Sequence, residues 1–196
     1  MARFSRSLNP PSYSDYEKYR QLLRVDFRYR CAYCERTESY LRGDEGFEID
    51  HFKPRRFREL LANYQNLYYS CRKCNRHKWE TWPSDEELSE GFRFSDPCAE
   101  DMYLSHLQEG ADGRLEALTN CGRYTRDHIR LDRPTLVEWR QARRVVSEKL
   151  PTLESALARL REFADSESDP SKREIALQEA AVLEGRIQLD RAQFLS

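Results

Sequence analysis

Two Cys-x-x-Cys pairs constrain the fold of this chain more than any other feature of its sequence. The first pair is Cys31 and Cys34, and the second is Cys71 and Cys74. Each pair offers two thiolates from one tight turn, and two such turns complete a tetrahedral sulfur cage for Zn²⁺. A redox dithiol is the alternative for a single pair, but two copies outside a βαβ unit would be unusual. The spacing therefore predicts a structural zinc ion that crosslinks two distant turns.

The expected cellular compartment agrees with this interpretation. No run of apolar residues approaches the roughly 18 that a membrane-spanning helix needs, and the N-terminal stretch lacks the apolar segment of a secretory signal. We therefore expect a cytoplasmic protein without membrane contact, in which cysteines serve as metal ligands or free thiols. Cys98 and Cys121 have no partner at ligand spacing and are expected to be small buried thiols.

Charge is segregated along the chain, although 33 Lys and Arg nearly balance 34 Asp and Glu overall. Residues 51–78 contain eight basic residues and one acid, whereas residues 80–101 contain eight acids and one base. The overall balance excludes a uniformly basic nucleic-acid coat. A local basic block is typical of a phosphate-binding surface, although many charge runs are only solvated faces.

The residues inside the basic block favour a catalytic interpretation. In a strand, the neighbours Asp50 and His51 point to opposite sides, so one side chain can hold a metal while the other accepts a proton. Asn75 follows the last cysteine directly, on the first turn of an expected helix. A carboxylate and an amide oxygen suit Mg²⁺ or Mn²⁺.

This arrangement resembles an HNH endonuclease with the ββα-metal fold and two zinc knuckles. The resemblance covers about residues 31–80 and rests on Asp50-His51, Asn66-Leu67 and the run Cys71-x-x-Cys74-Asn75-x-x-Lys78. Asn75 stands where many members have His, which favours a hard, oxygen-preferring cation. The resemblance implies an α+β fold, with a small HNH core and its zinc site flanked by an N-terminal helix and a C-terminal helical hairpin.

The resemblance also implies roles for single residues. His51 would be the general base that activates water, while Asp50 and Asn75 would hold one Mg²⁺ or Mn²⁺ at the scissile phosphate of DNA. Asn66 would hydrogen-bond the loop that carries His51. Phosphate contacts would come from Arg55, Arg56 and Lys78. The implied products carry a 5′-phosphate and a 3′-hydroxyl.

Four segments are expected along the 196 residues. Residues 1–30 form an N-terminal helical segment, with Ser14 as the helix cap, and residues 31–82 form the zinc-stapled nuclease core. Residues 83–133 contain an acidic loop and a small β element over 102–104 and 115–118. Residues 134–196 are helical, with a break at Pro151 and a last helix over 172–194. That last helix repeats apolar residues at heptad spacing, namely Ile175, Val182 and Leu189.

The tail of the chain carries a second, less specific resemblance. Asp96-Pro97-Cys98 and residues 131–138 resemble bacterial HNH proteins that include nuclease subunits of Septu-type and retron-linked anti-phage systems. This implies the effector of a defence complex with an ATPase or other protein partner, and a homodimer would allow cleavage of both strands. The alternatives are a non-catalytic, zinc-stabilised nucleic-acid-binding module and an assembly module whose helices carry the function. A second Asp-His pair, Asp127-His128, lacks the downstream motif and is assigned no catalysis.

Overall fold

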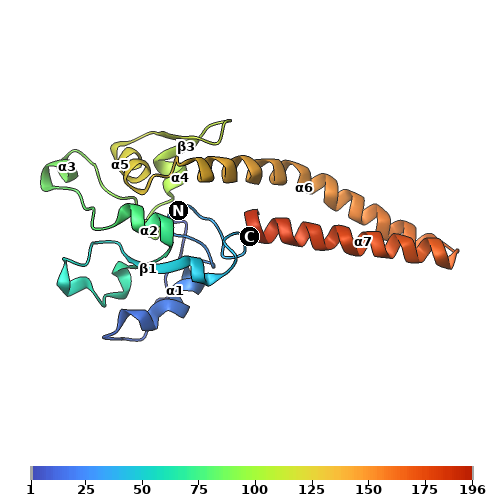
Figure 1. The fold of residues 1–196 in the computed structure, drawn as a ribbon, viewed down its shortest axis with the longest axis horizontal. Helices are drawn as coiled ribbons and strands as arrows, with labels where there is room; N and C mark the ends of the chain where they lie inside the picture. The colour runs from blue at the N-terminus through green and yellow to red at the C-terminus, as the bar shows by residue number, and fades with distance from the viewer. Residues whose placement is uncertain (1, 196) are drawn as a thin grey trace. The chain divides into compact units, whose positions relative to one another are not determined.

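A computed structural model describes residues 2–195. Met1 and Ser196, the outer ends of the expected N-terminal segment and C-terminal region, lie outside the described residues. The chain divides into two units, Met1–Trp139 and Arg140–Ser196. Helices and two small antiparallel sheets confirm the expected α+β class (Figure 1). Within residues 2–195, no helix combines the length and apolar character needed to cross a bilayer.

A ββα motif lies at the centre of the first unit. Strands β1 (Phe47–His51) and β2 (Leu67–Cys71) pair antiparallel, with His51 opposite Leu67 at one end. The partner of β1 is therefore reached only after the loop of residues 52–66, which contains two short 3-10 turns, Arg58–Leu60 and Tyr64–Asn66. Helix α2 (Arg72–Lys78) starts immediately after β2 and packs on both strands.

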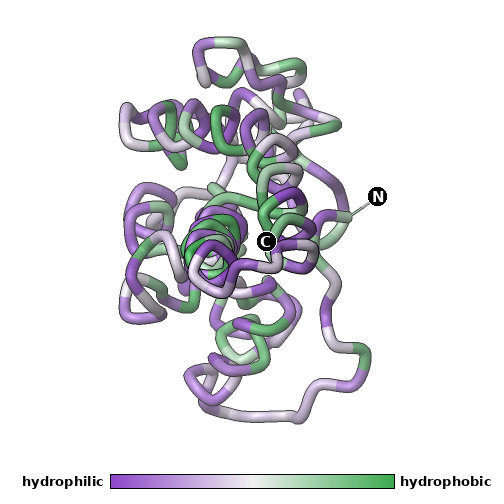
Figure 2. Tube along the Cα trace, turned by 90° about the vertical axis from the view of Figure 1, so that its right-hand side faces the viewer, coloured by the Kyte–Doolittle hydropathy of each residue, from purple (hydrophilic) through white to green (hydrophobic). Residues whose placement is uncertain are grey.

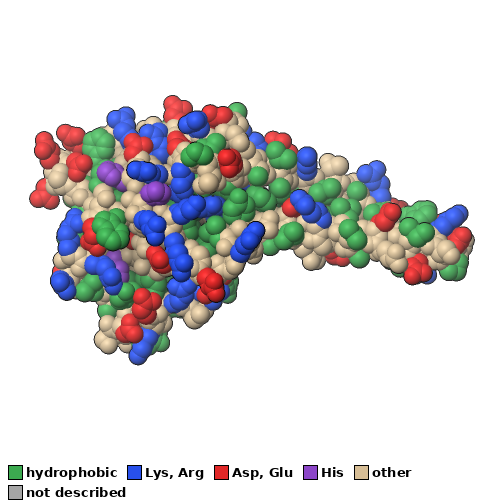
Figure 3. Space-filling model, in the orientation of Figure 1, with side chains coloured by type: hydrophobic (Ala, Val, Ile, Leu, Met, Phe, Trp, Pro, Cys, Tyr) green, Lys and Arg blue, Asp and Glu red, His purple; other side chains and the backbone are tan. Residues whose placement is uncertain are grey.

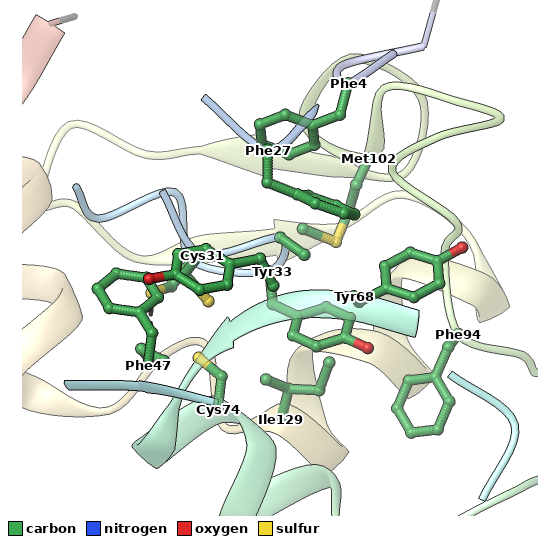
Figure 4. Packing of buried hydrophobic residues seen from close by; sticks show 14 of the residues in the cluster. Phe4, Phe27, Cys31, Tyr33, Phe47, Tyr68, Cys74, Phe94, Met102 and Ile129 are labelled. Carbon is green, nitrogen blue, oxygen red and sulfur yellow. Dashed lines mark hydrogen bonds between the residues drawn. The ribbon is translucent and has the colours of Figure 1, made fainter. Parts of the chain in front are cut away.

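The hydrophobic core surrounds β2, whose residues are all buried. Figure 4 shows side chains from separate segments, including Phe27, Phe47, Met102 and Ile129, gathered around this strand. The ring of Phe47 stacks on Tyr69 with 4.7 Å between centroids, and Phe27 lies 5.5 Å from Tyr68. These large aromatic side chains bury much apolar surface per residue, so a five-residue strand can anchor a small core.

The N-terminal helix is shorter than the expected range of 13–30. It begins as a 3-10 turn over Tyr16–Tyr19 and continues as α1 (Arg20–Asp26). The expected cap Ser14 is wrong: the carboxylate of Asp15 accepts the hydrogen bond from the backbone N–H of Glu17. An Asp at this position accepts a hydrogen bond from an N–H that the turn leaves unpaired. Its negative charge also interacts favourably with the partial positive charge at the start of the turn.

Residues 83–133 contain more helix than the sequence predicts. A capping box at Ser84 starts helix α3 (Asp85–Ser89) inside the expected acidic loop, and Met102–Ser105 forms helix α4 instead of a strand. The small β element consists of β3 (Leu107–Glu109) and β4 (Leu115–Ala117), which pair antiparallel. Helix α5 (Asn120–Ile129) follows and was not expected.

The C-terminal region forms two long helices rather than three. Helix α6 (Pro134–Ser166) runs without interruption through Pro151, and α7 (Pro170–Asp190) ends in a π-helical turn, Arg191–Leu195. Proline removes its own N–H donor and crowds the carbonyl four residues earlier, but the flanking turns of a long helix can keep their hydrogen bonds. In the second unit, ion pairs join Arg161 to Glu184 and Arg191 to Glu154, so the two helices run antiparallel.

The expected apolar stripe of the last helix is not its buried face. Val182 is 76 % exposed, and Ile175 and Leu189 are also exposed, whereas Ala176, Ala180 and Ile187 are buried. Small residues let two helices approach closely, so packing selects the alanine face over the heptad face. Figure 2 shows hydrophilic residues interspersed with hydrophobic ones in both units, as the high charge content suggests.

Candidate active site

The four cysteines of the two pairs converge, as the spacing predicted. Cys31 and Cys34 lie in the turn after α1, Cys71 ends β2 and Cys74 lies in the first turn of α2. Their sulfur atoms all lie within 4.8 Å of one another, and the Sγ atoms of Cys34 and Cys71 are 3.8 Å apart. Zn–S bonds of about 2.3 Å in a tetrahedron place sulfurs about 3.8 Å apart. The four thiols, which form no disulfide, therefore fit a zinc ion.

Two arginines lie next to this sulfur cluster. The guanidinium of Arg133 donates a hydrogen bond to Sγ of Cys74 at 3.3 Å. Burial lowers the pKa of Arg133, but the neighbouring sulfurs of Cys74 and Cys34 outweigh that effect and raise it. Arg36 is affected in the same way, chiefly by Cys34. Four thiolates around Zn²⁺ leave a net charge of about −2, which these two cations offset.

Three of the four expected catalytic residues, Asp50, His51 and Asn75, line one cavity of about 380 Å³, which we call the His51 cavity, whereas Asn66 lies outside its lining. Its walls include Glu48, Asp50, His51, Arg55, Asn75 and Trp79. Strand β1 supplies the first three and α2 supplies Asn75, while the loops after these elements supply the others. The structure thus brings the predicted base and both predicted metal ligands to one place, although their chemical roles remain predictions.

The imidazole of His51 is held in one orientation. Its Nε2 lies 2.9 Å from the carbonyl oxygen of Leu61, and Tyr16 packs edge-on with 4.8 Å between ring centroids. Because a carbonyl can only accept a hydrogen bond, Nε2 carries the proton and Nδ1 keeps its lone pair. Burial lowers the pKa of His51, which favours this neutral form.

Asn66 fastens the loop that follows β1. Its Oδ1 accepts a hydrogen bond from the backbone N–H of Lys53 at 2.7 Å, and its Nδ2 donates to the carbonyl of Lys53 at 3.0 Å. A second, longer hydrogen bond of 3.4 Å reaches the carbonyl of Leu60, next to the residue that binds His51. The side chain therefore ties both ends of the loop together, in line with the expected structural role.

Asp50 is more enclosed than the sequence suggests. Its carboxylate is 3 % exposed; Oδ2 accepts a hydrogen bond from the hydroxyl of Tyr33, and Oδ1 lies 3.2 Å from Nζ of Lys78. Lys78 is fully buried and also donates to the carbonyl of His51 at 2.7 Å. The expected phosphate contact of Lys78 is therefore not what the structure shows, because its ammonium faces inward to Asp50.

Asn75 is paired with a residue that the motif did not single out. Its Nδ2 donates a hydrogen bond to Oε2 of Glu48 at 2.8 Å, which leaves its Oδ1 as an acceptor. Glu48 is half-exposed and also lies 3.4 Å from the guanidinium of Arg72. Glu48, Asp50 and Asn75 thus bring carboxylate and amide groups to the walls of the His51 cavity.

Basic residues extend beyond the His51 cavity. Arg55 and Arg56 are exposed, and with Arg58 they line a neighbouring hollow, the arginine hollow, which shares Tyr16, Arg55 and Glu80 with the His51 cavity. Arg55 lies over the ring of Tyr16, 5.1 Å from its centroid. Figure 3 shows Lys and Arg side chains interspersed with carboxylates over the region of β1 and α2.

Comparison with known families decides what this segment is. Residues 31–80 match the family model described as HNH endonuclease. They form an HNH domain. Among curated proteins no match was found, and no solved structure matches the chain. The matched range contains the four cysteines, strands β1 and β2, and helix α2. The segment that matches the family model is therefore the same segment that forms the ββα motif.

Sequence reasoning missed several residues of the HNH domain's site. Glu48 could have been found, because period-two alternation places it on the same side of β1 as Asp50. Tyr33 could not, because its hydroxyl reaches Asp50 only through the turn that carries Cys31 and Cys34. The contact of His51 with the carbonyl of Leu61 could not be predicted either, because a backbone carbonyl is present at every residue.

The other cysteines lie outside the HNH domain. Cys121 is buried and Cys98 is half-buried, close to the expectation of small buried thiols. Cys121 lies near Glu100 and His106, with ligand atoms within 4.8 Å of one another. The guanidinium of Arg93 makes two hydrogen bonds to the carboxylate of Glu100, at 2.6 and 2.9 Å.

Proposed function

We propose that the HNH domain hydrolyses phosphodiester bonds of DNA with the help of a divalent metal ion. The observation that carries the proposal is the position of His51. Its ring lines the His51 cavity beside Asp50 and Asn75, with Nε2 bound to the carbonyl of Leu61. A fixed, neutral imidazole in a cavity with oxygen donors is the arrangement that metal-assisted hydrolysis requires.

In this proposal His51 acts as the general base. Nδ1 is the nitrogen with a free lone pair and takes the proton from the attacking water. As Nδ1 gains that proton, the Leu61 carbonyl keeps its hydrogen bond from Nε2, so the ring does not need to turn. The lowered pKa of His51 keeps the base unprotonated near neutral pH.

Glu48, Asp50 and Asn75 would hold the Mg²⁺ or Mn²⁺ ion. Once bound, the ion would neutralise charge on the scissile phosphate and on the leaving 3′ oxygen. Each oxygen of Asp50 makes one of its hydrogen bonds, so lone pairs remain for a metal. The lining of the cavity also contains four carboxylates against two guanidiniums, which would repel a phosphate in the absence of added positive charge.

Substrate phosphates would meet the arginines next to the site. Arg55 lines both the His51 cavity and the arginine hollow, while Arg56 and Arg58 continue along the latter. Arginine suits this position because its planar fork matches two phosphate oxygens. The cut would leave a 5′-phosphate and a 3′-hydroxyl. A role in anti-phage defence, an ATPase partner and a homodimer stay proposals from the resemblance of the tail.

A nicking assay tests the proposal. Purified zinc-loaded protein is incubated with supercoiled plasmid in Mg²⁺, in Mn²⁺ or without either ion, and nicked DNA is measured. We expect metal-dependent nicking that His51→Ala reduces by about 100-fold or more, because a general base contributes about 10²–10⁴ in rate.

The matched control is His128→Ala, which removes the other histidine that follows an aspartate. Its ring packs on Tyr124 in α5, outside the His51 cavity. Equal nicking by His51→Ala and the wild-type protein would refute the role of His51. Retention of zinc and of DNA binding in His51→Ala, together with loss of nicking, separates the nuclease from a module that only binds DNA.

A further inference from the structure

Trp79 stands at an unusual position beside the His51 cavity. It follows the last residue of α2, lines the cavity together with His51 and Asn75, and is 72 % exposed. An exposed tryptophan gains little from packing inside its own chain. Its indole is thus a large apolar and aromatic surface held next to the proposed cleavage site.

The backbone of Trp79 is also strained. Its φ of 46° and ψ of −136° are close to those of the first central residue of a type II′ turn, where glycine is preferred. Two hydrogen bonds hold this turn: the N–H of Trp79 donates to the carbonyl of Asn75, and that of Thr81 to the carbonyl of Lys78. A bulky residue rarely adopts such a conformation, and strain of this kind is concentrated at functional sites.

The charges around Trp79 point to the chemistry of its partner. Arg55 lines the His51 cavity together with Trp79 and also lines the arginine hollow, so a phosphate chain that runs from the cavity into the hollow starts beside the tryptophan. A base attached to such a phosphate chain has a flat π-face, and tryptophan stacks on bases of any sequence. A base that is paired inside a duplex has both faces covered by its neighbours and offers no such surface.

We propose that Trp79 stacks on an unpaired nucleobase next to the phosphate bound at the His51 cavity. The proposal rests on the proposed function and narrows its substrate to DNA with an unpaired base at the cleavage point. Such DNA is single-stranded, or locally opened within a duplex. Trp79 is a positioning and selectivity residue here, because it touches the base and not the reacting phosphate.

Binding measurements on uncleaved DNA test this proposal. His51→Ala protein, zinc-loaded and full length, serves as the parent, so that cleavage does not interfere. Mg²⁺ is present throughout, to offset the carboxylates of the His51 cavity. Three labelled probes of about 12 nucleotides are compared: a thymidine strand, an abasic strand with the same phosphates, and a fully paired duplex. Adding Trp79→Ala should weaken binding of the thymidine strand by about 5- to 150-fold. Binding of the abasic strand and of the duplex should change less than about two-fold.

Tyr29→Ala is the matched control variant. Tyr29 is likewise an exposed aromatic residue with a positive φ, of 57°, but it lies outside the His51 cavity. It should leave the affinity for all three probes unchanged. Trp79→Gly should weaken strand binding like Trp79→Ala while keeping or raising the melting temperature, because glycine relieves the backbone strain.

Tryptophan fluorescence gives a second readout. The thymidine strand should quench the parent, and the quenching should disappear in Trp79→Phe, which retains Trp82 and Trp139. Three outcomes would each overturn the proposal. Trp79→Ala could reduce the affinity equally for the thymidine and abasic strands, or equally for the duplex. The parent could also fail to bind the thymidine strand. The nicking assay is independent: loss of stacking with His51-dependent nicking intact refutes only the role of Trp79, and stacking without any nicking refutes only the nuclease.

Discussion

The buried pair of Asp50 and Lys78 gives the most demanding test of the site as described. Lys78 has no exposed surface, and its Nζ lies 3.2 Å from Oδ1 of Asp50. With an effective dielectric constant of about 20, two unit charges at this distance attract by about 5 kcal/mol. Removing one partner of such a pair leaves a buried, uncompensated charge and costs about 3–5 kcal/mol. Lys78→Met should therefore lower the free energy of unfolding of the first unit by about 3–5 kcal/mol.

The assay is urea unfolding of zinc-saturated protein, followed by tryptophan fluorescence. Trp79, Trp82 and Trp139 all lie in the first unit, so the signal reports chiefly on that unit. Lys73→Met is the control, because Lys73 is an exposed lysine on the same helix. It should change the free energy of unfolding by less than about 0.5 kcal/mol.

A double variant separates loss of the pair from loss of packing. In Asp50→Asn with Lys78→Met neither charge remains, so the combined loss should be smaller than the sum of the single losses by about 2 kcal/mol. Additive single losses, or a cost of Lys78→Met below about 1 kcal/mol, would show that Lys78 does not hold the carboxylate of Asp50.

Three further predictions concern the scaffold. Asn66→Ala should lower the free energy of unfolding by about 1–2 kcal/mol in a urea titration, because it removes the two hydrogen bonds that Asn66 makes with the backbone of Lys53. Removing zinc with a chelator, or replacing Cys34 with Ser, should unfold the HNH domain as seen by near-UV circular dichroism, since the sulfur cluster joins its two halves. Burial alone would raise the pKa of Glu100, but hydrogen bonds from Arg93 and His106 lower it to about 2, below the unfolded value. Glu100→Gln should therefore lower the free energy of unfolding by about 1–2 kcal/mol above about pH 5. Solvent screening keeps the loss this small, since Arg93 is 40 % exposed. In acid titrations the difference in stability from the wild-type protein should vanish as the pH falls toward 2.

The features that the sequence predicts best are those fixed by ligand spacing. Cys-x-x-Cys pairs have one geometry that satisfies a tetrahedral metal, so the convergence of Cys31, Cys34, Cys71 and Cys74 follows from spacing alone. The start of α2 also follows, because the second pair sets where β2 ends and the helix begins.

Side-chain partners in the site could not be predicted in the same way. The resemblance implied a phosphate contact for Lys78, and only the packing of α2 on β1 shows that its ammonium faces Asp50. The pairing of Asn75 with Glu48 likewise cannot be predicted without the register of β1 and β2. Both are tertiary contacts, which a short sequence motif does not predict.

The helical region shows the complementary failure. Heptad spacing of Ile175, Val182 and Leu189 predicted a buried stripe, yet the alanine face of α7 is buried instead. Period alone cannot choose between two faces of a helix when small residues on one of them allow closer packing. The predicted helix break at Pro151 was also wrong. The energetic cost of the proline is local, whereas α6 gains hydrogen bonds along its whole length.

The strand register explains how one cysteine cluster can order the candidate active site. Cys71 pairs with Phe47, so the end of β2 that carries a cysteine lies beside the start of β1, and Glu48 pairs with Ser70 one residue further. Because α2 begins at residue 72, its first turn carries Asn75 back to within hydrogen-bond distance of Glu48. His51 lies at the far end of the same strand, and its position is fixed by the loop that Asn66 closes. Helix α2 also reaches His51, because Lys78 donates a hydrogen bond to its carbonyl. The oxygen donors and the base therefore both depend on the helix that the cysteine cluster positions.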